Sequence, residues 1–488
     1  MTLVRLATAL VAVASSPLVF AASPAPAAKG TPLPRAVEAV SAASAYETVA
    51  KLSSPEFAGR RTGAPGFMAA ARWAAARLRE AGLAAPADAP DYLERFPVEF
   101  STPTAERMEL LPADGGAPRE LKPFKDYLAL LYSGTADVTA EVVFVGFGIT
   151  APEMGRDDYA GVDVSGKIVM ALRGAPADGR DWSAHDSHRA RTAAAKAHGA
   201  AGYLFAESAV ANPNGAAVEG LAMAAVSEEI AGDVLSSSKL KLDELRRVLA
   251  KGGTASFAAG RRVHLAVTGG APVKGEAANV VALLRGSDPA LAGEYVLVGA
   301  HLDHCGDWPE LLPGADDNAS GAATVLEIAR AAARLAPRPR RTIAFVLFAG
   351  EESGLLGSKQ FAARPPRGLG RCVGVYNLDM VGAGNGAYVA GGENFPELLR
   401  RLVEARDRQG SPLELKSGRS SGEPRADHGP FQAAGIPAVS LFGMGGAHHG
   451  YHTNEDTIFF ITPKTMEAIG RVALEAAANL ADAPPAAR

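Results

Sequence analysis

From Ala277 to Leu480 the chain alternates short apolar runs with amphipathic helical segments, and this alternation constrains the fold more than any other feature. Short β-branched runs that alternate with longer helical patterns are typical of a mostly parallel sheet covered by helices. In such a sheet, residues that follow the carboxyl ends of the strands converge on one crevice, where ligands usually bind. We therefore expect side chains that lie far apart in the sequence to meet there.

The expected architecture is an α/β fold with a mostly parallel or mixed central sheet flanked by helices. The expected strands are Asn279–Leu284, Tyr295–Ala300, Thr342–Phe348, Val373–Leu378 and Ala438–Phe442. The expected helices are Ala319–Leu335, Leu355–Ala363, Pro396–Asp407 and Pro463–Leu480.

Acidic and histidine side chains follow several of these strands. His301 follows the apolar run VLVGA, the pair Glu351-Glu352 follows TIAFVLFAG, and Asp379 ends the segment NLD. The alternative to metal binding is a structural role for the glutamate pair, because the helix dipole stabilises negative charge at a helix start by about 0.3–1 kcal/mol. Neighbouring residues point in different directions, so one glutamate can bind a metal while the other faces a substrate.

Two further segments supply candidate ligands. Asp316 and Asp317 precede a helix in PGADDNASG, and adjacent carboxylates are costly unless a cation neutralises them. The alternative is a helix-capping role, which Asn318 could also fill. The glycine-rich loop GMGGAHHGYHTNEDT bears three histidines, of which His452 is the favoured ligand, although any one of them could be a surface residue.

This set of residues predicts a two-metal hydrolytic centre. Nitrogen and oxygen ligands without cysteine exclude a structural zinc site of the thiolate type. They favour zinc, with cobalt or manganese as possible substitutes. Two metals about 3.5–4 Å apart can hold a water whose pKa falls toward about 7. Asp303, two residues after His301, is placed to orient that imidazole.

The motifs that carry these residues resemble the zinc aminopeptidase family of metallopeptidases called M28. They are HLD at His301–Asp303, GADDNASG at Gly314–Gly321, Glu351-Glu352, NLD at Asn377–Asp379 and HTNEDT at His452–Thr457. The resemblance runs through Ala277–Leu480 in the order of the family, and the stretch Gly59–Leu83 resembles the start of the same catalytic domain.

The resemblance implies a role for each residue. Asp316 would bridge two zinc ions, with Glu352 and His452 completing one site and His301 and Asp379 the other. Glu351 would be the general base, Asp303 would hold His301, and Asp317 would follow the bridging ligand in a strained peptide link. The implied activity is the removal of N-terminal residues from peptide substrates.

Composition, length and the N-terminal segment predict the number of domains, the class of partner and the localisation. The chain has 488 residues, of which 48% are hydrophobic and 21% charged, so it is long enough for several domains. A formal net charge of −4 gives no reason to expect a nucleic-acid partner. Residues 1–21 resemble a secretory signal with cleavage after Ala21, which predicts a secreted or periplasmic protein without stable membrane insertion; an uncleaved anchor is the alternative.

The expected domain organisation has five parts. After the signal, residues 22–35 are rich in Ala and Pro and are expected to be a disordered linker. Residues 36–120 are assigned to the N-terminal part of the peptidase domain, 121–272 to an inserted β-rich domain and 273–483 to the catalytic domain. The segment GVDVSGKIVMALRG within 121–272 resembles the protease-associated (PA) domain that is often inserted in such enzymes.

Three alternative functions remain open. A carboxypeptidase-like or dipeptidase activity would need cations such as Arg419 and Arg425 to hold a substrate carboxylate. A glutaminyl cyclase-like enzyme would use the same scaffold with one zinc. A binding or receptor-like protein would have an inactive centre, which the presence of Glu351 and of all five expected ligands argues against.

Several properties cannot be predicted from the sequence. Substrate specificity is expected to depend on the segments Ala383–Gly392, Gly418–Phe431 and Phe442–Tyr451, and Asp427, Tyr451 and Phe431 are candidate substrate contacts. The oligomeric state is unknown. Cys305 and Cys372 should lie at opposite ends of parallel strands, too far apart for a disulfide.

Overall fold

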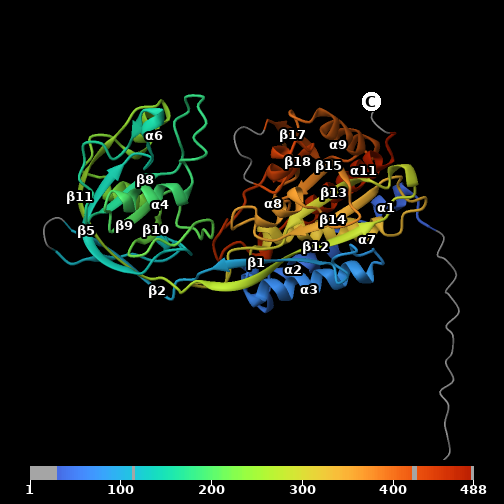
Figure 1. Cartoon of the computed structure of the whole chain (residues 1–488), viewed down its shortest axis with the longest axis horizontal. Helices are drawn as coiled ribbons and strands as arrows, with labels where there is room; N and C mark the ends of the chain where they lie inside the picture. The colour runs from blue at the N-terminus through green and yellow to red at the C-terminus, as the bar shows by residue number, and fades with distance from the viewer. Residues whose placement is uncertain (1–29, 113–115, 420–425, 485–488) are drawn as a thin grey trace, which may run out of the picture.

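The chain forms two domains, each built on its own large sheet (Figure 1). The computed structural model describes residues 30–112, 116–419 and 426–484. The predicted signal and most of the predicted linker lie outside these residues. The end of that linker is helical, because α1 (Leu33–Glu38) begins within it and buries Ala36 and Val37 against the larger domain. The linker prediction is therefore wrong for residues 33–35.

The larger domain contains the predicted sheet. Across the sheet its strands are β1 (Leu93–Phe100), β12 (Val273–Leu284), β14 (Thr342–Phe348), β13 (Glu294–His301), β15 (Arg371–Leu378), β18 (Ala438–Met444), β16 (Gly386–Ala390) and β17 (Glu414–Gly418). The central strands β14, β13, β15 and β18 are parallel, whereas β12 is antiparallel to β14, and β16 to β18. The predicted mixed α/β class is confirmed.

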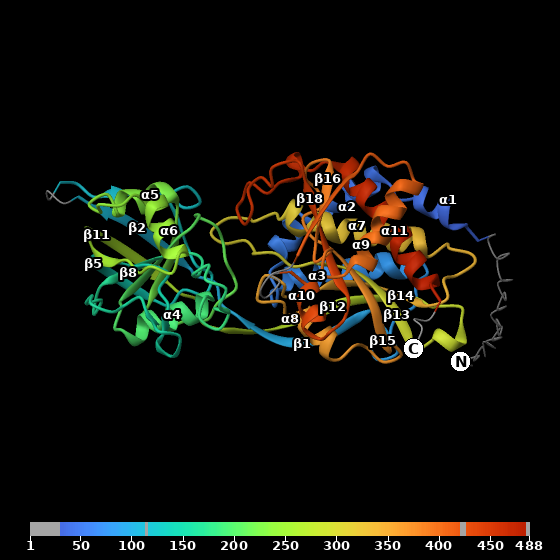
Figure 2. The same cartoon turned by 90° about the horizontal axis from the view of Figure 1, so that it is seen from above.

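Helices cover both faces of this sheet (Figure 2). The helices on one face are α1, α2 (Ala42–Leu52), α3 (Pro65–Glu80), α7 (Gly321–Ala332), α9 (Pro396–Arg408) and α11 (Pro463–Asp482); those on the other are α8 (Leu356–Ala363) and α10 (His428–Ala433). In β13, Val296 and Val298 enter the first core and Tyr295 and Leu297 the second. Burial on both faces explains why the central strands are apolar without alternation.

The second domain is inserted between β1 and β12. Its sheet runs β3 (Arg119–Glu120), β2 (Ala105–Leu111), β11 (Ser256–Thr268), β5 (Ala136–Val145), β8 (Ile168–Leu172), β9 (Gly202–Ala206), β10 (Ala222–Val226) and β4 (Tyr127–Ala129). Its smaller strands and its helices are β6 (Thr150–Ala151), β7 (Arg156–Asp157), α4 (His188–Ala197), α5 (Glu228–Val234) and α6 (Leu242–Ala250).

The insertion begins earlier than the sequence suggested. β2 and β3 pair within the second sheet, so the chain crosses into the inserted domain between Phe100 and Ala105 and returns between Thr268 and Val273. The predicted boundary at residue 121 is therefore too late. The polar, half-exposed β2 carries no signal that distinguishes its sheet from that of β1.

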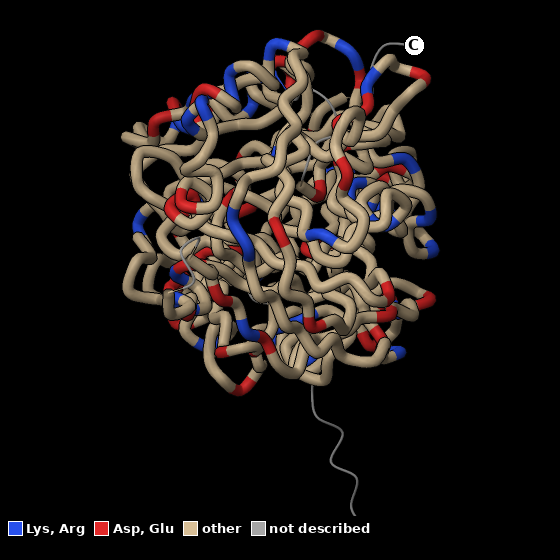
Figure 3. Tube along the Cα trace, turned by 90° about the vertical axis from the view of Figure 1, so that its left-hand side faces the viewer, with Lys and Arg blue, Asp and Glu red and all other residues tan. Residues whose placement is uncertain are grey.

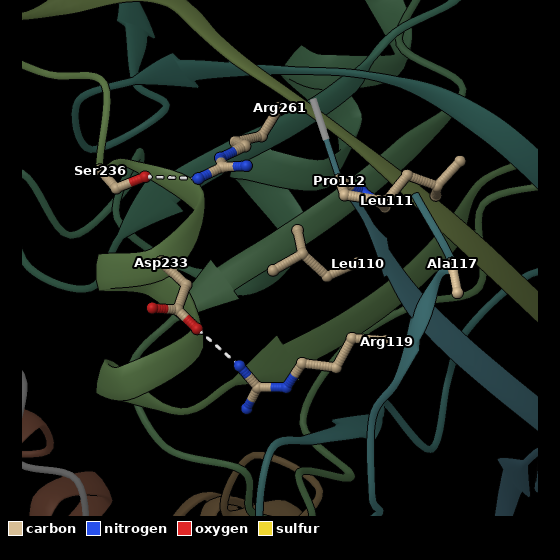
Figure 4. A pocket seen from close by; sticks show the side chains of 8 residues that line it. All are labelled: Leu110, Leu111, Pro112, Ala117, Arg119, Asp233, Ser236 and Arg261. Atoms are coloured by element: carbon tan, nitrogen blue, oxygen red, sulfur yellow. Dashed lines mark hydrogen bonds and ion pairs between the residues drawn. The ribbon is translucent and has the colours of Figure 1, made fainter. Parts of the chain in front are cut away.

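The surface of the inserted domain is mixed in charge. Seen from that end of the molecule, Lys and Arg are interspersed with Asp and Glu along the trace (Figure 3). A pocket of about 290 Å³ lies beside β2 and α5, where Arg119 pairs with Asp233, and Arg261 donates to Ser236 (Figure 4). None of its lining residues belongs to the predicted site.

Two expectations about the chain as a whole can be compared with the structure. Cys305 and Cys372 are both buried and unpaired, in agreement with the expected absence of a disulfide between them. Within the described part of the chain, no helix has the length and hydrophobicity needed to cross a bilayer.

Candidate metal centre

The ends of three neighbouring parallel strands supply most of the predicted ligands. His301 ends β13, Asp379 follows β15, and Glu351 and Glu352 follow β14 closely. Since β14, β13 and β15 are adjacent in the sheet, their carboxyl ends lie at one edge. The structure thereby brings these side chains together, with His301 Nε2 lying 3.3 Å from Asp379 Oδ1.

Asp317 lies at the middle of the cluster. It comes from the irregular turn η4 (Ala315–Ser320), which precedes α7. Its Oδ1 is 3.3 Å from His301 Nε2, and its Oδ2 is 3.0 Å from His452 Nε2. One carboxylate oxygen therefore faces each half of the cluster, which is the arrangement that a metal-bridging carboxylate requires.

His452 and Glu352 form the second half of the cluster. His452 Nε2 lies 3.0 Å from Glu352 Oε2, yet this buried nitrogen has no hydrogen bond of suitable geometry. A tetrahedral zinc site with bonds of about 2.0–2.1 Å separates its ligand atoms by about 3.3 Å. The separations of 3.0–3.3 Å around Asp317 match that spacing, so the residues fit zinc.

The prediction that Asp316 bridges the metals is wrong in this structure. Its Oδ1 accepts hydrogen bonds from Gly382 N–H at 2.8 Å and from the Ser320 hydroxyl at 3.1 Å, and its Oδ2 lies 2.6 Å from His448 Nδ1. These partners occupy both oxygens and hold the carboxylate away from His301 and His452. A cis peptide bond joins Asp317 to Asn318, whereas the strained peptide link was expected between Asp316 and Asp317.

Asp456 fixes the backbone of this aspartate pair. Its carboxylate accepts hydrogen bonds from the N–H of Asp316 at 2.8 Å and of Asp317 at 3.0 Å. The next residue, Asn318, is also held in place, because its side-chain amide donates to the Leu378 carbonyl at 3.0 Å. Asp456 belongs to the HTNEDT segment, so this segment supplies both a candidate ligand and a support for the loop opposite.

Asp303 supports two parts of the site. Its backbone carbonyl lies 3.2 Å from His301 Nδ1, with one carboxylate oxygen at 3.8 Å from the same nitrogen. The carboxylate itself accepts hydrogen bonds from the N–H groups of Glu351 at 3.2 Å and of Glu352 at 3.3 Å. Asp303 therefore positions His301 mainly through its backbone and the glutamate pair through its side chain.

Glu351 faces the half of the cluster that contains His301 and Asp379, and a ligand atom from each of the three lies within 4.8 Å of the others. Burial raises the pKa of Glu351 well above its usual range, and the nearby charges of Glu352 and Asp427 add to that rise. Asp427 is also fully buried and its pKa is raised to about 7, first by burial.

The remaining charges of the cluster are strongly coupled. Burial alone would raise the pKa of Glu352, but His452 outweighs it and leaves that pKa at about 2. Burial lowers the pKa of His301, but Asp379 and Glu351 raise it well above its usual value. A buried set of this kind is stable only when positive charge compensates the carboxylates, as a bound cation would do.

Arg60 stabilises the loops beneath the cluster. This fully buried guanidinium donates to the carbonyls of Leu302 at 2.9 Å, Pro313 at 2.9 Å and Gly314 at 2.8 Å, and burial lowers its pKa to about 10. It thereby ties the loop after β13 to the loop that carries Asp317. Arg60 lies in the Gly59–Leu83 stretch singled out from the sequence.

His304 is a site residue that the sequence did not single out. Its Nδ1 lies 3.1 Å from Glu352 Oε1, and its Nε2 is buried without a hydrogen bond. Together with Cys305, Glu352 and His452 it forms a further group able to approach a metal. Its position three residues after His301 was the available signal, but a histidine in a loop is usually a surface residue.

The candidate substrate contacts differ in position. Phe431 is fully buried against Phe348 and Phe361, so it belongs to the core rather than to a substrate pocket. Tyr451 is partly exposed and stacks on His452 with ring centres 3.8 Å apart. Arg419 is exposed and lies 3.5 Å from Glu393, and Arg425 lies outside the described residues.

The catalytic domain is similar to a known protein family. Residues 279–477, which contain every strand-end residue described above, match the model of peptidase family M28. The segment 279–477 of this chain is therefore similar to peptidase family M28.

Two curated proteins are similar to parts of this chain. An enzyme from Streptomyces exfoliatus named leupeptin-inactivating enzyme 1 is 33% identical over 165 residues, which cover 34% of this chain and 35% of that protein. This chain therefore spans about a third of the length of that relative. A protein from Pseudomonas aeruginosa named aminopeptidase is 26% identical over 429 residues, 84% of this chain and 71% of that protein.

Two solved structures share the fold of this chain. An aminopeptidase from Aneurinibacillus sp. strain AM-1 superposes with a TM-score of 0.65 at 23% identity, over 92% of this chain and 95% of that one. A peptidase M28 precursor from Shewanella amazonensis SB2B gives the same TM-score and identity over 93% and 97%. Coverage this high must include most of the inserted domain.

Proposed function

We propose that this chain is a member of peptidase family M28 and is a di-zinc aminopeptidase that removes N-terminal residues from peptides. The observation that carries the proposal is the position of Asp317, whose two carboxylate oxygens face His301 on one side and His452 on the other. One zinc would be held by His452, Glu352 and Asp317. The other would be held by His301, Asp379 and the second oxygen of Asp317.

Two zinc ions in such a centre supply Lewis acidity, which lowers the pKa of a water molecule and polarises a peptide carbonyl. The protein must then supply a proton carrier. Glu351 has the position for it, beside His301 and Asp379, and is not needed as a ligand in the proposed sets. A carboxylate in this position can take a proton from water and return it to the leaving amine.

The aminopeptidase polarity is supported by the relatives. The Pseudomonas and Aneurinibacillus proteins are named aminopeptidases, and the Pseudomonas match runs over 84% of this chain. A carboxypeptidase-like enzyme would need a cation beside the cluster to bind the substrate carboxylate. Of the two candidate arginines the structure describes only Arg419, which is exposed beside Glu393. A cyclase-like enzyme would bind one zinc, and the ligands in the other half of the cluster would then bind no metal.

The test is a panel of aminoacyl chromogenic substrates assayed with the native enzyme, after chelation and after zinc is added back. We expect hydrolysis that the chelator abolishes and zinc restores. Peptides blocked at the N-terminus should resist hydrolysis, whereas peptides blocked at the C-terminus should be cleaved. Cleavage of only the peptides blocked at the N-terminus would contradict the proposed polarity.

We also propose that the enzyme is exported and that its inserted domain is a PA domain. The export proposal rests on the apolar N-terminal segment and on Val19 and Ala21 at positions −3 and −1 of the expected cleavage site. The domain proposal rests on the segment GVDVSGKIVMALRG, which contains β8. Mass spectrometry of the mature protein would show a chain that begins at Ala22; an intact Met1 would contradict cleavage.

A further inference from the structure

The inserted domain contacts a candidate metal ligand directly. His452 Nδ1 lies 2.7 Å from the carbonyl oxygen of Ala211, and the Ala211 N–H donates to the carbonyl of His452 at 2.9 Å. Ala211 belongs to the loop between β9 and β10, residues 207–221, which we call the β9–β10 loop. The two hydrogen bonds join backbone from one domain to a site residue of the other.

The contact with Nδ1 determines how His452 presents its other nitrogen. A carbonyl oxygen can only accept, so Nδ1 must carry the proton in this pair. Neutral His452 then offers the lone pair of Nε2, which is the atom that lies 3.0 Å from both Asp317 and Glu352. Ligating histidines are commonly held in this way by a carbonyl or carboxylate on the other ring nitrogen.

The β9–β10 loop also reaches the turn that follows Glu351 and Glu352. A Cβ built on Gly354 would lie 3.1 Å from the Asn214 side-chain oxygen, so Asn214 packs against the turn that follows the glutamate pair. Within that turn, the Gly354 N–H donates to the Glu351 carbonyl at 2.9 Å. The loop therefore touches both the segment of His452 and the segment of Glu351 and Glu352.

Packing holds the loop in this position. Ala211 is fully buried in a small apolar cluster that contains Leu128 and Leu131 of the inserted domain with Cys305 and Leu312 of the catalytic domain. Farther along the loop, Gly215 lies against the ring of Tyr132, where an added Cβ would come within 2.2 Å. In Figure 2 the loop after β18 reaches from the catalytic domain toward the inserted domain.

We propose that the inserted domain completes the metal centre, with the backbone carbonyl of Ala211 acting as the positioning group for His452. This inference rests on the proposed function and deepens it, because it makes one of the two zinc sites depend on docking of the β9–β10 loop. Zinc at the His452 site should bind weakly when the loop is displaced. Zinc at the His301 site should not respond.

The test uses Ala211→Pro in the full chain. Proline removes the N–H that donates to His452, and its ring displaces the loop from this contact. Zinc affinity is measured on metal-free protein by titration against a chromophoric chelator, which resolves the two binding steps. We expect one step to weaken about 10–100-fold, as is usual when the group that orients a ligating histidine is lost, and the other to stay at its wild-type value.

A matched control separates orientation from general damage. Ala177→Pro removes a comparable backbone hydrogen bond, from the Ala177 N–H to the Ala250 carbonyl at 2.8 Å, inside the same domain. It should leave both zinc affinities unchanged. Circular dichroism and the melting temperature of the metal-free proteins show that the variants are folded.

A second variant displaces the β9–β10 loop without introducing a proline. Gly215→Val should push the loop from Tyr132 without touching His452, and it should weaken the same zinc step. Unchanged affinities in both folded variants, or equal losses at both steps, would overturn the inference. A wild-type chain that binds zinc only at one site would instead overturn the proposed function, so the two failures are distinguishable.

Discussion

At the scale of single residues, the direction of each carboxylate decides its role. Asp316 and Asp317 are neighbours in the sequence and are both buried, but only Asp317 reaches the two histidines. Asp316 is held by Gly382, Ser320 and His448. The two residues therefore differ in contacts and not in chemistry.

Replacing Glu351 by Gln tests the proposed proton carrier. The amide keeps the size of the side chain but cannot take a proton from water, so kcat should fall about 10²–10⁴-fold. Zinc content, measured by inductively coupled plasma mass spectrometry, should stay at two per chain. Retained turnover would show that another group carries the proton.

Glu106 in the inserted domain should make stability depend on pH. Its Oε2 accepts the Ala129 N–H at 2.7 Å while Oε1 is buried without a partner, and burial raises its pKa to about 7. The folded state then binds more protons than the unfolded state between about pH 4.5 and 7, so the contribution of Glu106 to stability is lost as the pH rises through this range.

Replacing Glu106 by Gln should reduce this loss. The amide can still accept the Ala129 N–H and does not ionise, so the variant should lose less stability between pH 5 and 8 than the wild type, by roughly 1–3 kcal/mol. Urea unfolding at a series of pH values measures the difference. Parallel stability profiles of the two proteins would contradict the burial of this carboxylate.

Most residues of the candidate site could be predicted from the sequence, but the bridging aspartate could not. His301, Glu352, Asp379 and His452 follow strands or lie in a distinctive loop, so the strand–helix pattern indicates a shared edge. No such pattern separates Asp316 from Asp317, because both precede the same helix. Only the hydrogen bonds of the folded loop select between them.

At the scale of elements, the loops at the sheet edge hold one another. The loop after β18 supplies Asp456, whose carboxylate accepts the N–H groups of both aspartates in η4. The β14–α8 turn is held by Asp303 from the loop after β13. The segments that carry Asp317 and Glu352 are therefore positioned by elements other than their own.

Replacing Asp456 by Asn should loosen the loop that carries Asp317. The amide nitrogen would face one of the two N–H donors, so one hydrogen bond is lost. We expect zinc affinity to fall about 10–100-fold, as for other supporting residues of metal sites. Chelator competition measures the change, and the exposed neighbour Glu455→Gln is the control that should behave as wild type. An Asp456→Asn variant with wild-type affinity would contradict this support.

The strands that carry the site were predictable because their sequences are continuously apolar. Thr342–Phe348 was predicted with the observed bounds of β14, and the other predicted strands of this domain lie within β12, β13, β15 and β18. The edge strands β1 and β17 were missed, as was β16, which lies between β18 and β17. Their partly exposed sequences lack the long apolar run that marks a buried strand.

At the scale of the whole molecule, the two domains meet at the centre rather than only at their connecting strands. The contact between Ala211 and His452 could not be predicted, since a backbone carbonyl leaves no signature in the sequence. The boundary of the insertion was likewise misplaced, because β2 has no feature that assigns it to one sheet.

Zinc should stabilise the fold as well as the activity. A ligand that binds only the folded state at a free concentration 100 times its Kd adds about 2.7 kcal/mol per site. The melting temperature of metal-free protein should therefore rise on addition of zinc and return after chelation. Differential scanning calorimetry measures the shift, and an unchanged melting temperature would argue against a buried zinc centre.

The central claim is that Asp317 joins two zinc ions, and the zinc content of a matched pair of variants tests it most directly. Asp317→Asn should bind zinc much more weakly and retain fewer than two ions per chain after dialysis at a fixed free zinc concentration. Asp316→Asn keeps an oxygen that can accept the Gly382 N–H and should retain two ions. Two zinc ions in Asp317→Asn and fewer in Asp316→Asn would contradict the account.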